Sequence, residues 1–88
     1  MEFEFEFDSA KSMSNLVKHG INFSDAKRLW HDPRVLIVKA RQVVEPRWVA
    51  IGCVNRKHWS AIFTHRGERI RIISVRRSRP KEIALYES

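Results

Sequence analysis

Cysteine, tyrosine, glycine and proline are all scarce in this chain of 88 residues, which has one Cys, one Tyr, three Gly and three Pro. A single cysteine excludes an intramolecular disulfide. Cys53 stands in the apolar run WVAIGCV, so we expect a small core residue there rather than a reactive thiol. The low content of Gly and Pro, without any repeat, argues against linkers and low-complexity segments.

Long apolar runs are also missing. No run approaches the roughly twenty residues that span a bilayer, and the acidic start EFEFEFD is unlike a signal or transit peptide. We therefore expect a cytoplasmic protein without a membrane partner, although charge alone would also fit an anionic membrane surface.

The length leaves room for one domain, residues 1–88, with one small core and no separate cofactor domain. The four histidines, at positions 19, 31, 58 and 65, show no paired spacing typical of metal ligands. The sequence thus predicts neither a structural metal nor a cofactor.

Positive charge is present in excess and is unevenly spread. The formal net charge is +7, yet residues 1–33 carry four Lys or Arg against six Asp or Glu, whereas residues 34–88 carry thirteen against four. This asymmetry predicts a basic face, which suits a nucleic-acid backbone better than solubility alone.

The first third of the chain reads as a strand and two helices. Glu2 to Phe7 alternates Glu and Phe, which predicts a short edge or pairing strand. Asp8 is a candidate N-cap for a helix over Ser9 to His19, which Gly20 would end. Apolar residues recur in this helix at helical spacing: Ala10, Met13, Leu16 and Val17. Ser24 is the candidate N-cap of a second helix, with Ala26, Leu29 and Trp30 as its apolar stripe and Pro33 stopping it.

The pattern becomes extended after Pro33, over residues 35–38, 47–54, 58–65 and 69–77. Short polar connections at 55–57 and 66–68 predict hairpins, and residues 82–87, after Pro80, predict a terminal helix. The expected fold is α+β in the order β-α-α-β-β-β-β-α, with two helices on one face of a twisted antiparallel sheet. The tryptophans should fill the core, with base stacking on Trp48 or Trp59 as an alternative role.

The most informative stretch is THRGERIRIISVRR, from Thr64 to Arg77. Arg69 and Arg71 share one parity, while Ile70 and Ile72 share the other, as a strand with one cationic face requires. Forked guanidinium donors match phosphate oxygens, so the strand predicts contacts with a polyanion. A merely solubilising edge strand is the alternative.

Three separated motifs closely resemble the BrnT family of bacterial toxins: FEFDSAKSMSNLVKHGINFSDA, RWVAIGCV and FTHRGERIRIISVRRS. The resemblance covers nearly the whole chain. It implies a RelE-like fold and a ribonuclease activity that arrests translation. It also implies neutralisation by a BrnA antitoxin with a ribbon-helix-helix part. Operator DNA would then be bound only through the antitoxin. The departures are Phe7, Ser78 and a segment between Ala40 and Arg47 that lacks the family's acidic, glycine-rich loop and leaves Glu45 as a candidate contact.

Metal-independent RNA cleavage uses the substrate's 2′-hydroxyl as nucleophile, so the protein must supply a base, an acid and cations for the transition state. Arg66, Arg71 and Arg76 are the candidates for clamping phosphate, with Arg69 and Arg77 as backbone contacts. Their parity differs, so all five cannot point one way unless a bulge or the end of the strand intervenes.

His65, beside Arg66 at a hairpin, and Tyr86 are the acid–base candidates, with Glu68 and Glu82 as further ones. Four residues are expected to contact nucleic acid: Thr64, Ser74, Lys18 and His19. Each also has an ordinary structural explanation, such as helix capping for His19. Two other functions remain open: a noncatalytic module that binds RNA or the ribosome, and a decayed toxin that binds only its antitoxin.

Overall fold

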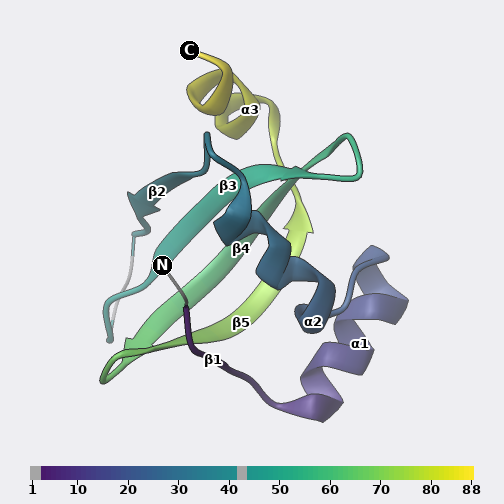
Figure 1. The fold of residues 1–88 in the computed structure, drawn as a ribbon, viewed down its shortest axis with the longest axis vertical. Coiled ribbons are helices and arrows are strands. Elements are labelled where there is room, and N and C mark those ends of the chain that lie inside the picture. The colour runs from purple at the N-terminus through teal and green to yellow at the C-terminus, as the bar shows by residue number, and fades with distance from the viewer. Residues whose placement is uncertain (1–2, 42–43) are drawn as a thin grey trace.

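The computed structural model describes residues 3–41 and 44–88 and confirms an α+β fold (Figure 1). A five-stranded sheet is accompanied by three α-helices and one 3-10 helix. The elements, in chain order, are β1 (Phe5–Glu6), α1 (Ser9–His19), α2 (Phe23–Ala26), η1 (Lys27–His31), β2 (Leu36–Lys39), β3 (Trp48–Val54), β4 (Lys57–Arg66), β5 (Arg69–Arg77) and α3 (Pro80–Glu87). Within the described residues, no helix is both long and apolar enough to cross a membrane.

The sheet has the strand order β1-β5-β4-β3-β2. Strands β2 to β5 form the predicted antiparallel meander, but β1 pairs parallel to β5, so the prediction of a wholly antiparallel sheet was wrong. Short turns set the antiparallel order of β3 to β5, and β2 pairs with the next strand along the chain. In contrast, β1 meets a strand more than sixty residues away, and no turn sets its direction. Glu2, where the first strand was predicted to begin, lies outside the described residues.

Helix α1 has the predicted ends. The Asp8 carboxylate accepts hydrogen bonds from the N–H groups of Ala10 and Lys11, and Gly20 closes the helix with a φ of 87°.

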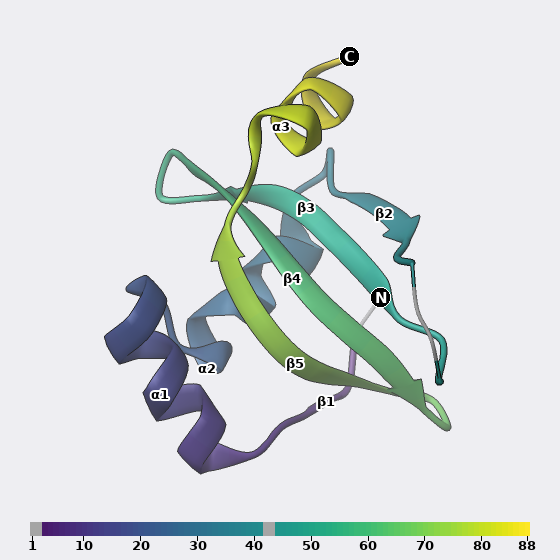
Figure 2. The same cartoon turned by 180° about the vertical axis from the view of Figure 1, so that it is seen from behind.

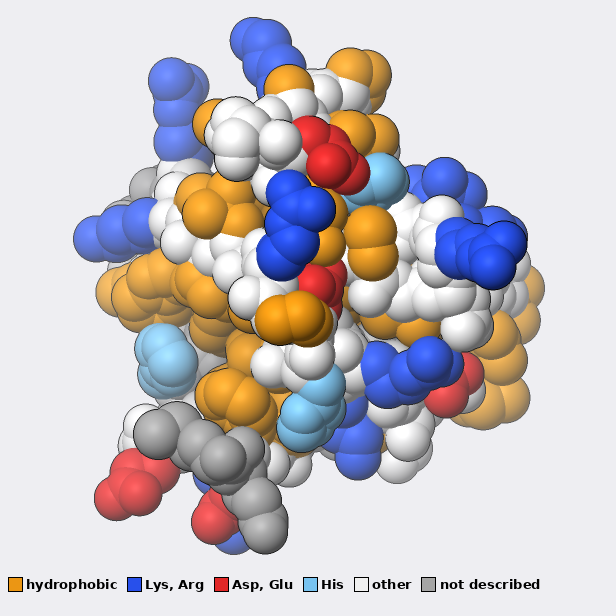
Figure 3. Space-filling model, turned by 45° about the horizontal axis from the view of Figure 1, so that its top comes forward, with side chains coloured by type: hydrophobic (Ala, Val, Ile, Leu, Met, Phe, Trp, Pro, Cys, Tyr) orange, Lys and Arg blue, Asp and Glu red, His pale blue; other side chains and the backbone are white. Residues whose placement is uncertain are grey.

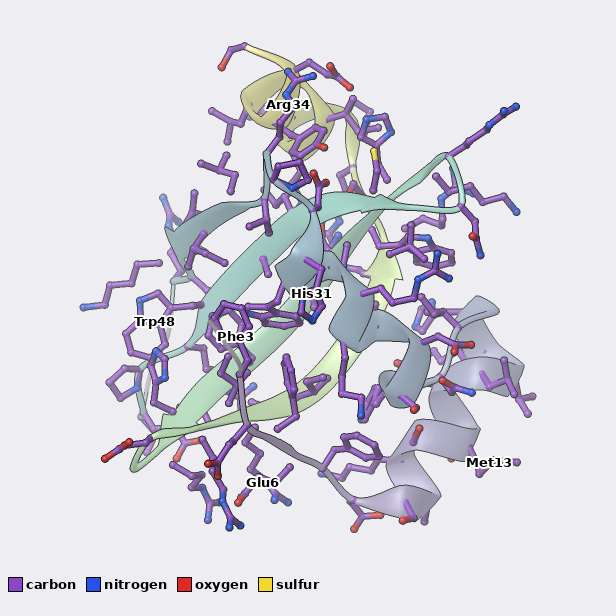
Figure 4. The ribbon with its side chains drawn as sticks, in the orientation of Figure 1. Phe3, Glu6, Met13, His31, Arg34 and Trp48 are labelled. Carbon is purple, nitrogen blue, oxygen red and sulfur yellow. The ribbon has the colours of Figure 1, made fainter. Side chains whose placement is uncertain are left out.

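The orientation of α1 is the reverse of what its apolar spacing suggests. Ser12 and Asn15 are its buried residues, whereas Met13 is 60% exposed and Val17 86%. Figure 4 shows Met13 pointing away from the sheet. The apolar residues Ala10, Met13, Leu16 and Val17 therefore do not pack on the core as a stripe, because hydrogen bonds hold the polar side inward.

Those hydrogen bonds centre on Asn15. Its Nδ2 donates to the carbonyls of Ile21 and Val75 at 2.8 Å each, and its Oδ1 accepts from the Val75 N–H at 3.1 Å. Ser12 Oγ accepts from the Phe23 N–H. The side-chain amide of Asn15 thus forms hydrogen bonds with the backbone of β5 beyond the end of β1. Without it, β5 would leave N–H and C=O groups unpaired there.

The second helix begins at Asn22, whose side chain accepts from the Asp25 N–H, so the prediction of Ser24 as N-cap was wrong. Asn22 has the extended backbone that an N-cap requires. After Ala26 the chain tightens into η1, and Leu29 and Trp30 are buried as their spacing predicts.

The core lies between these helices and the sheet, and Trp30 and Trp59 are buried in it while Trp48 packs against it. Phe5 meets the Trp30 ring edge-on, and Phe7 meets Phe23 in the same way. Cys53, predicted to be a small core residue, is partly buried and packs against the smaller core cluster on the opposite face of the sheet.

One β-bulge decides which side chains share a face. In the β4–β5 ladder Phe63 pairs with Ile72 but Ile62 pairs with Ser74, which leaves Ile73 as an extra residue. The parity of β5 therefore changes at Ile73, as the arginine positions require. The helices α1 and α2 occupy one face of the sheet, and Figure 2 shows the other face, with α3 at one end. We call this second side the open face.

Candidate nucleic-acid interface

The register places the three candidate clamp arginines on the open face. Thr64 stands opposite Arg71 and Ser60 opposite Arg76, and residues opposite one another in a ladder point to the same side. Arg66, two residues after Thr64, faces the same way. The bulge at Ile73 thus brings Arg66, Arg71 and Arg76 to one face, together with Arg69.

The opposite parity places two other candidates on the helix side of the sheet. Arg77 stands opposite Trp59, with its guanidinium carbon 5.5 Å from the ring centroid. His65 stands opposite Ile70 and packs against the rings of Trp48 and Phe63. The structure therefore does not bring His65 together with Arg71 and Arg76.

Two arginines of the open face meet carboxylates of β1. Arg71 Nη1 lies 3.1 Å from Glu6 Oε1, and Arg69 lies 3.4 Å from Glu4 and 3.8 Å from Glu6. The Glu-Phe alternation explains this arrangement, because the glutamates face the arginines while the phenylalanines pack on the helix side. Glu6 lies at this edge of the sheet in Figure 4.

Arg76 is held by a bidentate ion pair with Glu82 of α3. Both guanidinium nitrogens donate to the carboxylate, at 2.8 Å each. Ser60 Oγ and the Arg79 N–H also donate to Glu82 Oε1. The hydrogen bonds from Arg76 outweigh burial, and with the bonds from Arg79 and Ser60 they lower the pKa of Glu82 to about 2. Glu82 is thus a poor proton acceptor near neutral pH.

Tyr86 lies one helical turn beyond Glu82 and is buried on the open face. Its hydroxyl donates to Asp32 Oδ2 at 2.6 Å, and this hydrogen bond is the main cause that raises the pKa of Tyr86. Figure 4 shows Arg34 beside α3, and its guanidinium carbon is 5.5 Å from the Tyr86 ring centroid.

Asp32 anchors this end of the sheet to α3. Burial favours its neutral form, but the hydrogen bonds from Tyr86 and from the N–H groups of Arg34 and Cys53 prevail, so the pKa of Asp32 is lowered. Gly52 makes the approach possible, because a Cβ there would lie 3.0 Å from Asp32 Oδ2.

His58 is a candidate that the sequence interpretation missed. It stands opposite Cys53 and has the parity of Ser60, so it belongs to the open face. Its Nε2 lies 2.8 Å from Glu87 Oε2, and its ring meets the Tyr86 ring with centroids 5.5 Å apart. Counting by twos along β4 from Arg66 would have identified His58 and set aside His65.

The open face therefore has two cationic ends rather than one clamp. Arg71 and Arg76 stand opposite Thr64 and Ser60, four residues apart on β4, which is about 13 Å at the usual rise of roughly 3.3 Å per residue. The end at the β4–β5 turn holds Arg66, Arg69 and Arg71, and the end at α3 holds Arg76 with His58 and Tyr86. Figure 3, seen from the α3 end, shows Lys and Arg side chains standing out on several sides.

Thr64 shares the open face with Arg66 and Arg71, whereas Lys18 and His19 lie on α1. Thr64 Oγ1 donates to the Pro46 carbonyl at 2.8 Å and is buried, so the hydroxyl already has a partner within the fold. Lys18, His19 and Ser74 come together around a pocket between α1 and β5.

A comparison with protein-family models matches residues 7–82 to a family described as ribonuclease toxin, BrnT, of type II toxin-antitoxin system. The chain belongs to the BrnT family. The match begins at Phe7, before the α1 cap, and ends at Glu82, the partner of Arg76, so it includes all of β2 to β5. A search of curated proteins finds no match. This BrnT ribonuclease toxin thus carries Arg66, Arg69, Arg71 and Arg76 on a sheet face that the two N-terminal helices leave uncovered.

Proposed function

We propose that this BrnT toxin cleaves RNA without a metal at the α3 end of the open face, arresting translation, and that a BrnA-type ribbon-helix-helix antitoxin neutralises it. The observation that carries the proposal is the convergence of Arg76, His58 and Tyr86 on one face. The groups with clearly shifted pKa values, Asp32, Arg76, Glu82 and Tyr86, all lie at this end, and such clustering is typical of functional sites.

The reaction needs a base, an acid and a cation at the phosphate. In our assignment His58 takes the proton of the 2′-hydroxyl as that oxygen bonds to phosphorus. The bond from phosphorus to the 5′-oxygen breaks, and Tyr86, turning its hydroxyl away from Asp32, protonates this leaving oxygen, which is far more basic than a phenolate. Arg76 stabilises the negative charge on the phosphorane-like transition state. The proton then returns from His58 to Tyr86, which restores the site.

Arg66, Arg69 and Arg71 then hold phosphates along the rest of the strand. The carboxylates of Glu4 and Glu6 fix Arg69 and Arg71 in place, which reduces the side-chain entropy lost when phosphate binds. Arg66 has no ion pair among residues 3–41 and 44–88 and is exposed. Arg77 faces the helix side and is assigned to a flanking contact, whereas His65, on the same side, is left out of the proposed site.

Cleavage of labelled RNA in EDTA, with and without ribosomes, tests the proposal. The expected products have 2′,3′-cyclic phosphate ends, and His58→Ala should lower the rate by about 100-fold or more. His65→Ala is the matched control on the same strand and should keep the rate within about threefold, with circular dichroism confirming that both variants fold.

Each alternative predicts a different result in that assay. A noncatalytic module would retain RNA in a salt-sensitive way without cleaving it. A decayed toxin would do neither and would bind only the antitoxin. Loss of cleavage in His65→Ala but not in His58→Ala would overturn the assignment of the base.

A further inference from the structure

We propose that the pocket between α1 and β5 binds a backbone phosphate of the RNA other than the one that is cleaved. The inference rests on the proposed ribonuclease function and adds a substrate-binding site to it. The pocket has a volume of about 180 Å³, large enough for a phosphate group. Its lining residues are Lys11, Ser14, Asn15, Lys18, His19, Phe23, Ile73 and Ser74.

The lining has the chemistry of an anion site. Lys11, Ser14 and Lys18 follow one another at intervals of three and four residues, so they share one flank of α1. Two lysines, a histidine and two serines are among the residues that line the pocket, and the lining includes no Asp or Glu. Lys18 and His19 stand in the last turn of α1, where the helix dipole stabilises cations.

The position of the pocket suits RNA that follows β5. Ser74 lies just after the bulge and two residues before Arg76, a separation of about 7 Å along a strand. Arg76 faces the open side and α1 lies on the other side, so a single strand that passes round the edge of β5, beyond the end of β1, would reach both the pocket and Arg76. Inorganic phosphate would share the chemistry of the site, and an antitoxin carboxylate would compete for it.

Fluorescence anisotropy with an RNA methylated at its 2′-hydroxyls, which binds but is not cleaved, tests the pocket. Lys18→Gln is expected to weaken binding five- to tenfold at fixed salt and to reduce the slope of log K against log salt by about 0.7. Lys39→Gln, an exposed lysine on the far edge of the sheet, is the matched control. In a second experiment, titration with inorganic phosphate should shift the NMR signal of the Ser74 amide in the wild type but not in Lys18→Gln.

Unchanged RNA affinity and salt slope in Lys18→Gln would overturn the proposal that the pocket binds RNA. A variant that loses binding only of inorganic phosphate, or only of the antitoxin, would overturn it as well. Failure of the wild type to bind RNA at all would instead refute the proposed function.

We also propose that the apolar flank of α1, formed by Met13, Leu16 and Val17, is a docking surface for the antitoxin. All three side chains are exposed although the helix packs on the sheet through Ser12 and Asn15. Exposed apolar clusters on a small protein typically mark an interaction site. This inference rests on membership of a type II toxin–antitoxin family, which implies a protein partner.

Size and charge favour the antitoxin over a second copy of this chain. Three side chains on one short helix cannot supply the roughly 1,200 Å² or more that a stable protein interface buries, so the flank fits a partner that also binds elsewhere. Lys11 and Lys18 border the flank on the next side of the helix, so an amphipathic segment with an acidic margin is complementary to it.

Affinity for the small protein encoded by the adjacent reading frame tests the docking surface. Val17→Asp should weaken binding of that small protein at least tenfold. The toxicity of the variant expressed alone should stay unchanged, but co-expression of the small protein should no longer rescue growth. Val44→Asp is the control, because Val44 is also an exposed valine, at 93%. Wild-type binding that Val17→Asp leaves intact would overturn the surface, as would a change only in self-association measured by light scattering. If the wild type binds no such protein, the antitoxin proposal itself fails.

Discussion

Replacing Arg76 with alanine is expected to lower RNA cleavage by about 1,000-fold, which is the usual scale for removing an arginine that stabilises a phosphoryl transition state. The guanidinium is already fixed by Glu82 and faces the same side as His58 and Tyr86. Single-turnover cleavage of labelled RNA measures the loss, and growth arrest on induction is expected to disappear with it.

The control must separate catalysis from stability. Arg76→Ala leaves the Glu82 carboxylate without its main partner in a partly buried site, which destabilises the fold. Arg76→Ala combined with Glu82→Ala removes both charges, so it should recover stability but not cleavage. Arg76→Lys keeps the charge but loses the forked geometry and should cleave at an intermediate rate. Recovery of cleavage in the double variant would show that Arg76 acts only through the fold.

Replacing Asn15 with alanine is expected to destabilise the protein by about 3 kcal/mol or more. The change leaves the Val75 N–H and two carbonyl oxygens without their partner in a buried place, and each such group costs about 1–3 kcal/mol. Total stabilities of small domains are about 5–15 kcal/mol, so the effect is a large share.

Urea denaturation followed by circular dichroism measures this difference in the free energy of unfolding. Ser14→Ala, the exposed neighbour on the same helix, is the control and should change it by less than about 0.5 kcal/mol. Asn15→Asp keeps an acceptor for the Val75 N–H but loses both donors. We therefore expect it to lower the free energy of unfolding by more than Ser14→Ala does. Equal stability of Asn15→Ala and Ser14→Ala would contradict the role given to this amide.

Much of the fold follows from local patterns in the sequence. The caps of α1, the four later strands and the two hairpins all depend on neighbouring residues, and their predicted bounds are confirmed within a residue or two. The parallel pairing of β1 and the inward polar side of α1 depend on partners far along the chain, Ile70 and Val75. Helical periodicity cannot reveal that one asparagine will satisfy a distant strand.

The candidate site was predictable in kind but not in arrangement. Arginine at alternate positions of β5 indicated phosphate contacts, and the conflict in parity indicated either a bulge or an early end of the strand. The bulge was located only by the pairing of Ile62 with Ser74. His65 was a candidate because it neighbours Arg66 in sequence. Neighbours in a strand point to opposite sides, however, and His58 rather than His65 lies on the open face.

The bulge at position 73 absorbs one extra residue, and the kind of residue matters little. Ile73 has no opposing residue in β4, so many side chains should be accommodated there. Deleting it would join Ile72 directly to Ser74, so the ladder would continue without a bulge and Arg76 would stay opposite Ser60. An added residue that does not bulge out would instead turn Arg76 to the helix side and Val75 away from the core. A lineage of such toxins is therefore free to substitute or lose this residue, but not to flatten the bulge while keeping it.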